Sequence, residues 1–581
     1  MDKDYNYQEE LMNLPELLKK TDAIAEKLTN EQLLGLIHQI ARTLPEERRN
    51  EFLKLLCTTA EIQNPEQVTA QEDFGFSEDL KTAVSQCLER LKPIQDGTLC
   101  LESDINYDYY DYDDEETAFL FEDPEGILDI IRKSCETVHQ CVDATFWSEA
   151  YQLGTILLNL EVAVNGEYAD CADSTMDISD LVSYELLPAC DILSDTLCAA
   201  YQTLPMQERP AVFYALIQKS NCQDWKLEEL MQYASQELTQ MSEFLSCWIS
   251  YLGNVTEQSA EIFLYEAIRL QNDSVSALHT AESFVIQHPG LFEQVMLMQK
   301  NDTDLLAVGR EALQKIDVRY TVRGRIALMT ADCAFRLGMQ TEAEQFLTEA
   351  FRSDSTPKNY FRVLLESQDF MKYQPELYQI CTNVSCHKDE ETGYFLNRPE
   401  SLEQNYICPD EYEFFTFLNG DFQAVLKKMW KKKKSAFWEQ KFLKYGFALF
   451  CLYLYPDTKL ERGCQYLCDH LKKHFHISDE SIWKGLQKHR NLIPIPEEFK
   501  PELMQKLQNL IAFYTEQVME NNKRAQYEEC AAFVAALGEI LETGGKDNAK
   551  QELLLAYKAE YNRRIAFHRE LRAFGMKDGK K

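Results

Sequence analysis

Apolar residues along this chain recur mostly at the spacing of an α-helix. Leu33, Ile37, Ile40 and Leu44, for example, follow one another at intervals of four, three and four residues. Side chains at this spacing share one face of a helix, where a neighbouring helix can cover them. The pattern predicts an all-α protein.

The alternation of apolar and polar residues that marks a half-buried strand is nearly absent. Only two short runs, 98–101 and 117–121, are compatible with strands. Prolines such as Pro45, Pro289 and Pro357 stand between the helical patterns, as expected of a residue that breaks helices. The longest apolar run, 445–455, is about half as long as a membrane-spanning helix, so we expect no membrane span.

The clearest internal unit is a helix–turn–helix pattern over residues 324–357. Small residues recur along both predicted helices, and Gly338 stands at the turn between them. Small side chains let two helices approach closely, and glycine can close a tight turn. The unit resembles a tetratricopeptide (TPR) repeat without the usual Trp and Leu anchors, and residues 147–160 and 526–557 look like parts of further units. The predicted architecture is an irregular α-solenoid of TPR-like helical hairpins.

Two stretches without helical periodicity divide the chain. The first, 102–123, contains ten acidic residues. The second, about 369–419, gathers Pro, Gly, Asn and Tyr. The expected domains are an N-terminal helical cap (1–101), an acidic Tyr-rich linker (102–122), a TPR-like solenoid (123–368), an irregular connector (369–420) and a C-terminal helical module (421–581).

The acidic linker has two interpretations. It is either a solvated connection or a docking segment, in which tyrosines provide contact area and carboxylates steer a basic partner. The partner-binding candidates here are Tyr107, Tyr109, Tyr110 and Tyr112.

Charge separates the C-terminal module from the rest of the chain. The whole chain has 59 Lys and Arg against 96 Asp and Glu, a net charge of −37. Residues 421–581 alone hold 29 basic and 21 acidic residues, so the preceding part is strongly acidic. This balance excludes a nucleic-acid footprint over the whole surface, because such a footprint is basic.

A basic run interleaved with aromatic residues lies near the start of the C-terminal module. Lysines that follow phosphates beside rings that stack on bases are typical of single-stranded nucleic-acid binding. A solvated helix face, or a contact with the acidic part of the chain, gives the same pattern. The candidate residues, which surround Trp430, are Lys427, Lys428, Lys431, Lys432, Lys433 and Lys434.

Cysteines raise the question of metal binding. Cys381, Cys386, His387 and Cys408 provide four soft ligands within the irregular connector, although the paired Cys-x2-Cys spacing of many zinc sites is missing. They are weak candidates for a zinc site, and incidental thiols are the alternative. The pairs Cys464/Cys468 and His470/His474 fall on different faces of one predicted helix, so a single metal ion cannot easily collect both. The expected arrangement is core cysteines with solvent-facing histidines.

The distribution of the 18 cysteines also indicates the compartment. They are spread along a long chain, and many lie within apolar helical patterns, where a reduced thiol acts as a small hydrophobic residue. The first residues are polar and acidic, unlike a secretory signal peptide. We therefore expect a cytoplasmic protein.

Three segments together resemble a known family arrangement: 28–53, 123–161 and 556–575, the last with a Tyr/Arg/Arg run. They are similar to the large helical region found beside SWIM-type zinc fingers in uncharacterised bacterial proteins. The resemblance implies a helical-repeat body and no particular activity. A SWIM finger begins with Cys-x-Cys, which this sequence lacks, so the function of the finger does not carry over.

Signatures of common enzyme classes are missing from the sequence, including the P-loop, His-Glu-x2-His, Gly-x-Ser-x-Gly and Gly-x-Gly-x2-Gly. The expected function is a non-catalytic scaffold, without a cofactor, that binds another protein or peptide of basic character in a helical groove. Two alternatives remain: a nucleic-acid adaptor that uses the lysine run, and a zinc-containing or enzymatic protein with a site near Cys381 and Cys408.

Overall fold

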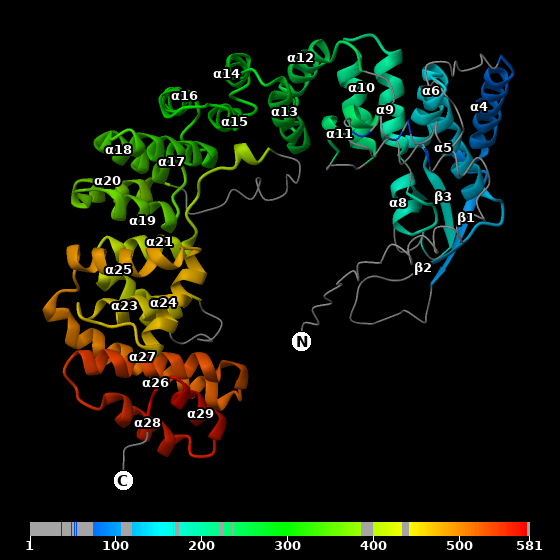
Figure 1. The fold of residues 1–581 in the computed structure, drawn as a ribbon. Helices are drawn as coiled ribbons and strands as arrows, with labels where there is room; N and C mark the ends of the chain where they lie inside the picture. Colours follow the sequence, from blue (N-terminus) through cyan, green and yellow to red (C-terminus); the bar gives the residue numbers. More distant parts are fainter. Residues whose placement is uncertain are drawn as a thin grey trace. The chain divides into compact units, whose positions relative to one another are not determined.

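A computed structural model describes most of the chain as two compact units, Met1–Tyr251 (unit 1) and Leu252–Lys581 (unit 2) (Figure 1). The division falls inside the region 123–368 that the sequence predicts to be one solenoid. No helix among the described residues combines the length and apolar character needed to cross a membrane. The described residues are 74–105, 119–166, 168, 174–189, 191–220, 225–234, 238–384, 399–432 and 441–577, with Ile37, Arg48, Phe52 and Lys54.

Unit 1 is mainly helical, as predicted. Four of its helices, α4, α5, α6 and α9, pack against one another, and Ile131, Leu153 and Leu197 are completely buried among them. Such burial of the apolar stripe stabilises each helix far more than helix propensity does. The helices are α4 (Phe74–Gln95), α5 (Ile127–Asp143), α6 (Trp147–Leu158), α8 (Ile178–Ser183), α9 (Ile192–Thr203), α10 (Arg209–Lys219), α11 (Leu227–Tyr233) and α12 (Met241–Leu252).

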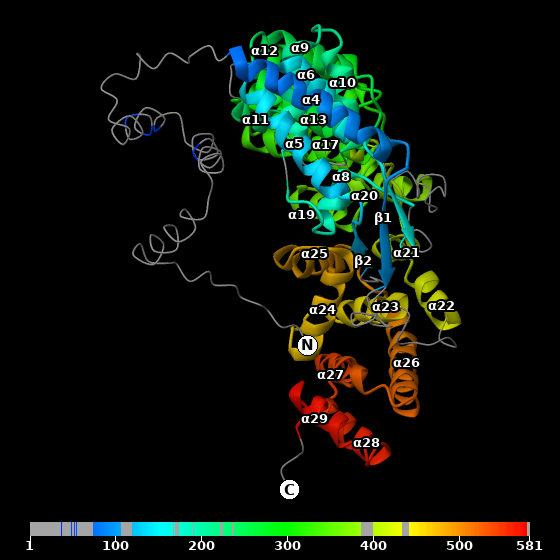
Figure 2. The same ribbon diagram turned by 90° about the vertical axis from the view of Figure 1, so that its right-hand side faces the viewer.

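A small sheet accompanies the helices of unit 1, with strand order β2-β1-β3-β4. Figure 2 shows β1 and β2 side by side. Strand β1 (Cys100–Ile105) pairs antiparallel with β2 (Phe119–Glu122) and parallel with β3 (Val162–Gly166). The two runs compatible with strands overlap β1 and β2. β3 was not predicted because it ends in Asn165 and Gly166, which are typical of turns, and β4 (Thr175–Met176) has only two residues.

The acidic linker 102–122 begins and ends in this sheet. Glu102 pairs with Glu122 in the register of β1 and β2, so the two ends of the predicted linker lie side by side. The intervening candidates Tyr107, Tyr109, Tyr110 and Tyr112 lie outside the described residues.

Unit 2 is helical throughout its described part, apart from one isolated β-bridge. Its first helices are α13 (Gln258–Gln271), α14 (Ser274–Ser283), α15 (Leu291–Leu297), α16 (Asp302–Lys315), α17 (Thr321–Arg336), α18 (Gln340–Ser353), α19 (Pro357–Glu366) and α20 (Phe370–Asn383). They are followed by α21 (Pro409–Leu418), α22 (Phe422–Lys432), α23 (Lys441–Tyr453), α24 (Arg462–Phe475), α25 (Asp479–Leu492), α26 (Lys500–Glu520), α27 (Tyr527–Thr543), α28 (Ala549–Glu560) and α29 (Ile565–Ala573).

The predicted helix–turn–helix at 324–357 is confirmed as the pair α17 and α18. Ala327 and Ala331 of α17, like Ala343 and Ala350 of α18, are completely buried, which lets the two backbones approach closely. Gly338 between the helices has φ +75°, the left-handed conformation that glycine adopts without steric cost. The pattern of small residues therefore identified this hairpin correctly.

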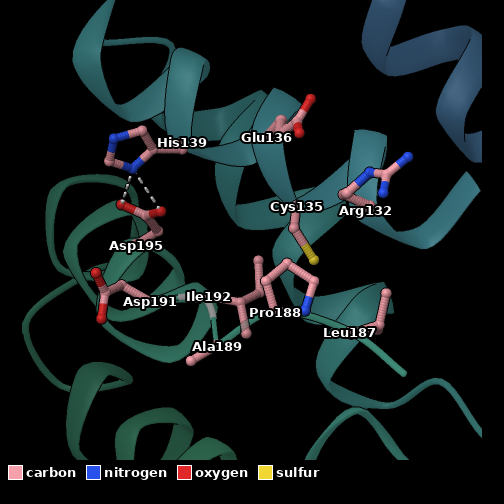
Figure 3. A pocket seen from close by; sticks show the side chains of 10 residues that line it. All are labelled: Arg132, Cys135, Glu136, His139, Leu187, Pro188, Ala189, Asp191, Ile192 and Asp195. Carbon is pink, nitrogen blue, oxygen red and sulfur yellow. Dashed lines mark hydrogen bonds and ion pairs between the residues drawn. The ribbon is translucent and has the colours of Figure 1, made fainter. Parts of the chain in front are cut away.

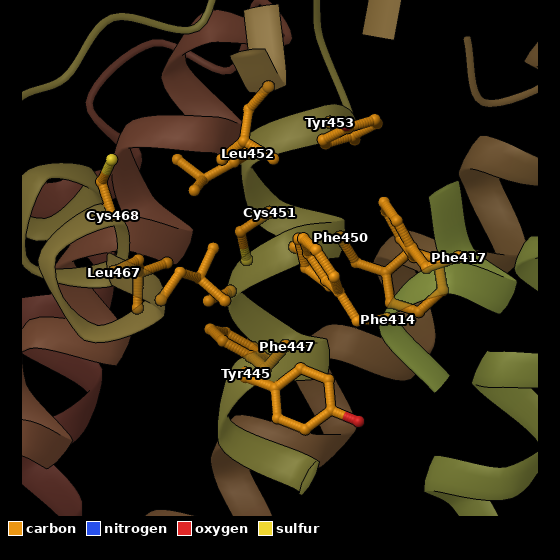
Figure 4. Packing of buried hydrophobic residues seen from close by; sticks show 14 of the residues in the cluster. Phe414, Phe417, Tyr445, Phe447, Phe450, Cys451, Leu452, Tyr453, Leu467 and Cys468 are labelled. Carbon is orange, nitrogen blue, oxygen red and sulfur yellow. The ribbon is translucent and has the colours of Figure 1, made fainter. Parts of the chain in front are cut away.

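The C-terminal helices share one aromatic-rich core (Figure 4). The ring of Phe417 lies edge-on to Phe450 at 5.0 Å and to Tyr453 at 4.8 Å, measured between centroids. Every residue of α23 from Tyr445 to Tyr453 is buried. The most apolar run of the sequence is therefore a core helix.

Helices α24 and α27 approach each other closely within this core. A Cβ atom on Gly463 would lie 2.4 Å from the backbone nitrogen of Ala536, so only glycine fits there. The buried Glu539 carboxylate accepts hydrogen bonds from the backbone N–H groups of Gly463 (2.9 Å) and Cys464 (2.7 Å) at the start of α24. Burial nevertheless raises the pKa of Glu539.

The cysteine and histidine pairs lie on α24, which packs against α27 in this core. Cys464 and Cys468 are buried in the core, as their spacing predicts. The histidines do not simply face solvent: the His474 ring stacks on Tyr445 with centroids 5.2 Å apart, and burial lowers the pKa of His470 to about 4. The two pairs lie on different faces of the helix, as predicted.

Candidate functional site

The lysine run begins on α22, where part of its charge is already neutralised. Lys428 pairs with the buried Glu413, and its Nζ lies 5.5 Å from the centre of the Phe442 ring. Lys427 and Lys431 are exposed on the same helix. Lys432 ends α22, and Lys433 and Lys434 lie outside the described residues. The structure therefore shows two exposed lysines of the six.

The cysteine candidates for zinc are not shown together. Cys381 is buried in α20, whereas Cys408 caps α21 by accepting a hydrogen bond from the Glu411 N–H at 3.5 Å. Burial raises the pKa of the Cys408 thiol to about 11. Cys386 and His387 lie outside the described residues. Within the described ranges, no group of three or more His, Cys, Asp or Glu side chains could hold a metal ion.

The structure instead reveals an extended segment, residues 399–408, that lies along helix ends in unit 2 (Figure 1). It begins with the 3-10 turn Glu400–Leu402 and ends where α21 starts. Its Ser401 and Ile407 are almost completely buried. The segment therefore occupies a defined binding surface, built by α13, α17, α18 and the residues between α18 and α19.

At its first end, the segment is held by a buried carboxylate. The Ser401 hydroxyl donates a hydrogen bond to Glu261 of α13, and the Ser401 N–H approaches the same carboxylate at 3.4 Å. The nearby Tyr265 hydroxyl has a strongly raised pKa, because it is buried and lies beside Glu261. His288 is fully buried, with its Nδ1 3.9 Å from Glu261, and Arg325 pairs with Glu400 at 3.6 Å.

In its middle, the segment pairs through its backbone. The Asn405 N–H donates to the carbonyl of Arg319 at 2.7 Å, and the Thr321 N–H donates to the carbonyl of Glu403 at 2.9 Å. Tyr320 and Gln404 form an antiparallel β-bridge at the same place. The residues that precede α17 thus act as a short edge to which an extended chain adds, a common mode of peptide recognition.

Asn405 then binds the junction of two helices with its side chain. Its Oδ1 accepts from the Ser355 N–H at 3.0 Å, and its Nδ2 donates to the Arg352 carbonyl at 3.0 Å. Backbone groups at helix ends have no partner within the helix, so they are available to such a ligand. One amide side chain supplies both the donor and the acceptor that this junction needs.

Sequence reasoning missed this surface. It treated 369–420 as an irregular connector, which is wrong at both ends, because α20 and α21 fall within these bounds. Glu261 is 140 residues away from its partner Ser401, and Ser355 is 50 residues away from its partner Asn405. No local sequence pattern predicts such pairings.

Comparison with known proteins adds no assignment. No protein-family model matches this chain, and no curated protein matches its sequence. The surface around residues 399–408 is therefore interpreted from its own contacts.

Proposed function

We propose that this protein is a non-catalytic scaffold whose TPR-like helical hairpins bind an extended segment of another protein. One observation carries the proposal: unit 2 already holds an extended segment, its own residues 399–408, by backbone pairing and buried side-chain anchors. In an irregular α-solenoid, each hairpin covers the apolar flank of the next and leaves a continuous surface for such a ligand. The resemblance to the SWIM-associated helical region agrees with this architecture.

The expected partner is basic. The chain has a net charge of −37, and its acidic residues are concentrated before residue 421. Exposed carboxylates on the helices of unit 2 include Asp304 in the first turn of α16 and Asp369 at the N-cap of α20. A field of this sign accelerates association with a positively charged segment and weakens at high salt.

The two alternatives have less support. In the lysine run, Lys428 is paired with Glu413, and nearby Lys444 is paired with Glu529 at 2.8 Å, so these two charges already have protein partners. For a zinc site, the Cys408 sulfur already caps α21 by accepting the Glu411 N–H. No described contact favours either alternative over the scaffold.

The proposal is tested with the full chain as bait in its native host, followed by cross-linking mass spectrometry. We expect a stoichiometric partner with a basic segment, cross-linked to α13–α20 of unit 2. Charge reversal by Asp304→Lys together with Asp369→Lys should reduce recovery of that partner severalfold. The matched control is Glu480→Lys together with Glu498→Lys, because both glutamates are also exposed and lie outside α13–α20, in α25 and in the 3-10 turn Glu497–Phe499.

Two results would contradict the scaffold. One is a partner whose cross-links fall outside α13–α20. The other is equal loss of binding in the charge-reversal and control variants, since this would show that only total charge matters.

A further inference from the structure

Unit 1 contains a pocket of about 260 Å³ between α5 and the residues that lead into α9 (Figure 3). Its buried carboxylate, Asp195, already accepts hydrogen bonds from the Tyr233 hydroxyl at 2.7 Å and from His139 Nδ1 at 2.9 Å. The carboxylates of Glu136 and Asp191 lie on opposite sides of the pocket, turned away from the apolar residues that line it. No single charged ligand can meet both, whereas the surface of unit 2 that holds residues 399–408 presents anchors that converge on one chain.

The backbone of residues 399–408 makes bonds that do not depend on their sequence. The N–H of Asn405 pairs with the carbonyl of Arg319, and the carbonyl of Glu403 pairs with the N–H of Thr321. Every residue other than proline offers the same two backbone groups, so another extended chain can form this pairing. Selectivity for one chain over another must therefore come from the side chains.

Buried and exposed side chains alternate along the segment. Ser401, Leu402 and Ile407 are buried, whereas Glu400 and Glu403 are exposed. A buried polar group needs a hydrogen-bonding partner, and the Ser401 hydroxyl has one in the surface that holds it. A chain that replaces the segment therefore needs a hydroxyl residue followed directly by an aliphatic residue.

The amide side chain of Asn405 fixes the spacing. It accepts a hydrogen bond from the Ser355 N–H and donates one to the Arg352 carbonyl, four residues after the hydroxyl of Ser401. Aspartate has no donor for that carbonyl, so it cannot take the place of asparagine. The surface thus selects a hydroxyl residue and, four positions later, an asparagine.

The charge of the segment does not match the surface that holds it. Burial raises the pKa of the Asp354 carboxyl, and repulsion from the carboxylates of Glu403 and Glu411 raises it further. A hydrogen bond from Asn359 and the charge of Arg325 offset this only in part. A lysine or arginine in place of Glu403 would replace repulsion from Asp354 by attraction. The basic segment expected of a partner is therefore better suited to this surface than the segment that occupies it.

We propose that residues 399–408 are an intramolecular competitor for a segment of another protein that binds the same surface. This inference rests on the proposed scaffold function, because it names the segment that the scaffold binds. The partner's segment is extended and contains Ser or Thr, a basic residue two positions later and Asn four positions after the hydroxyl residue. The competitor belongs to the same chain, so its effective concentration is high, and it lowers the apparent affinity for the partner until the partner displaces it.

The experiment measures how a fluorescein-labelled peptide of residues 399–407 binds to the full chain, by fluorescence anisotropy. The peptide must compete with the bound segment, so it should bind weakly to the unaltered chain. Asn405→Ala in the chain weakens the competitor but leaves the surface intact, and it should tighten peptide binding about tenfold. Gln404→Ala is the matched control, because Gln404 joins the surface through its backbone in the β-bridge to Tyr320.

Two further substitutions keep the test valid if Asn405→Ala impairs folding of the chain. Ser401→Ala in the chain releases the opposite end of the competitor and should also tighten peptide binding. Asn405→Ala in the peptide should instead abolish binding, because it removes an anchor from the incoming chain. Unchanged peptide affinity in Ser401→Ala and Asn405→Ala chains would overturn the proposal.

A second peptide, which carries Glu403→Lys, tests the charge of the partner. We expect it to bind the unaltered chain about fivefold more tightly than the first peptide, with a smaller advantage at high salt. In a chain with Asp354→Asn, which can still accept the hydrogen bond from Asn359, the difference between the two peptides should shrink. Equal binding of the two peptides to the unaltered chain would contradict a basic residue at this position.

These results can be separated from failure of the scaffold function. If neither peptide binds to any of the chains, residues 399–408 are a permanent part of unit 2 and the competitor is ruled out. A partner cross-linked elsewhere on α13–α20 would still support the scaffold in that case. If the peptides bind as expected but the native host yields no partner, the scaffold function fails and the exchange of segments at this surface stands.

Discussion

Two helix–helix contacts in unit 2 follow the same principle but differ in how far apart their partners lie in the sequence. Helices α17 and α18 are consecutive, and buried alanines on both allow them to pack closely. Helices α24 and α27 are separated by α25 and α26, yet Gly463 lies directly on the backbone at Ala536. Small residues bring helices together in both cases, but only the contact between α17 and α18 can be predicted from a local sequence pattern.

The largest effect is expected from breaking the distant contact. Gly463→Ala places a Cβ 2.4 Å from the Ala536 nitrogen and 2.8 Å from the Ala535 carbonyl carbon. The obstacle is backbone rather than a flexible side chain, so the helices must separate, at a cost of about 3 kcal/mol in the free energy of unfolding. Urea denaturation followed by circular dichroism measures this loss.

The same separation should weaken the hydrogen bonds that the backbone N–H groups at the start of α24 donate to Glu539. Hydrogen exchange of the first amides of α24 should therefore accelerate in Gly463→Ala. A control substitution, Gly545→Ala, affects a glycine with φ +90° and no atom within 4 Å of the added Cβ, so it strains only a turn. Equal destabilisation by both substitutions would contradict a close approach of α24 and α27.

The comparison also shows how much could be predicted from the sequence. The pattern of small residues and Gly338 identified the hairpin α17/α18, and the i, i+4 spacing placed Cys464 and Cys468 on one buried face. Both predictions depend on residues that are close together in the sequence. The contact between Glu539 and Gly463 spans 76 residues, and no local pattern records it.

The candidate sites depend even more on distant pairings. Ser401 meets Glu261 across 140 residues, and Asp195 meets His139 across 56 and Tyr233 across 38. A serine, a glutamate or a histidine on a helix is common, and only the fold shows which of them meet. The binding surface was therefore missed, whereas the helical character of most of the chain was predicted, apart from α20 and α21 within the expected connector.

A loss of stability of intermediate size is expected from a second difference between the two regions. The C-terminal core buries a histidine. The charged residues beside the α17/α18 hairpin instead form partly exposed ion pairs such as Arg336–Asp302. His489 is completely buried, its Nδ1 lies 3.2 Å from the Tyr453 hydroxyl, and burial lowers its pKa from 6.5 to about 4. The unfolded chain therefore binds a proton near pH 6.5 that the folded protein does not bind until about pH 4.

The contribution of His489 to stability should accordingly be complete above about pH 7 and be lost as the pH decreases through 6.5 toward 4. Between pH 7 and pH 5, His489 alone accounts for a loss of about 2 kcal/mol. Urea denaturation at several pH values measures the slope, and His489→Gln should flatten it by about that amount even if it lowers stability at every pH. An unchanged slope in this variant would show that His489 does not cause the acid sensitivity.

The smallest effect is expected in the hairpin itself, at the turn between α17 and α18. Gly338→Ala meets no atom within 4 Å, so any cost arises from the left-handed backbone at φ +75° rather than from packing. An L-residue other than glycine costs about 1 kcal/mol in this conformation, and asparagine costs less because it tolerates it better. Urea denaturation should rank the proteins as wild type, Gly338→Asn and Gly338→Ala in order of decreasing stability. Gly463→Ala acts through packing, whereas Gly338→Ala acts through the backbone conformation alone. Similar losses of unfolding free energy in both variants would contradict the larger effect expected at the distant α24/α27 contact.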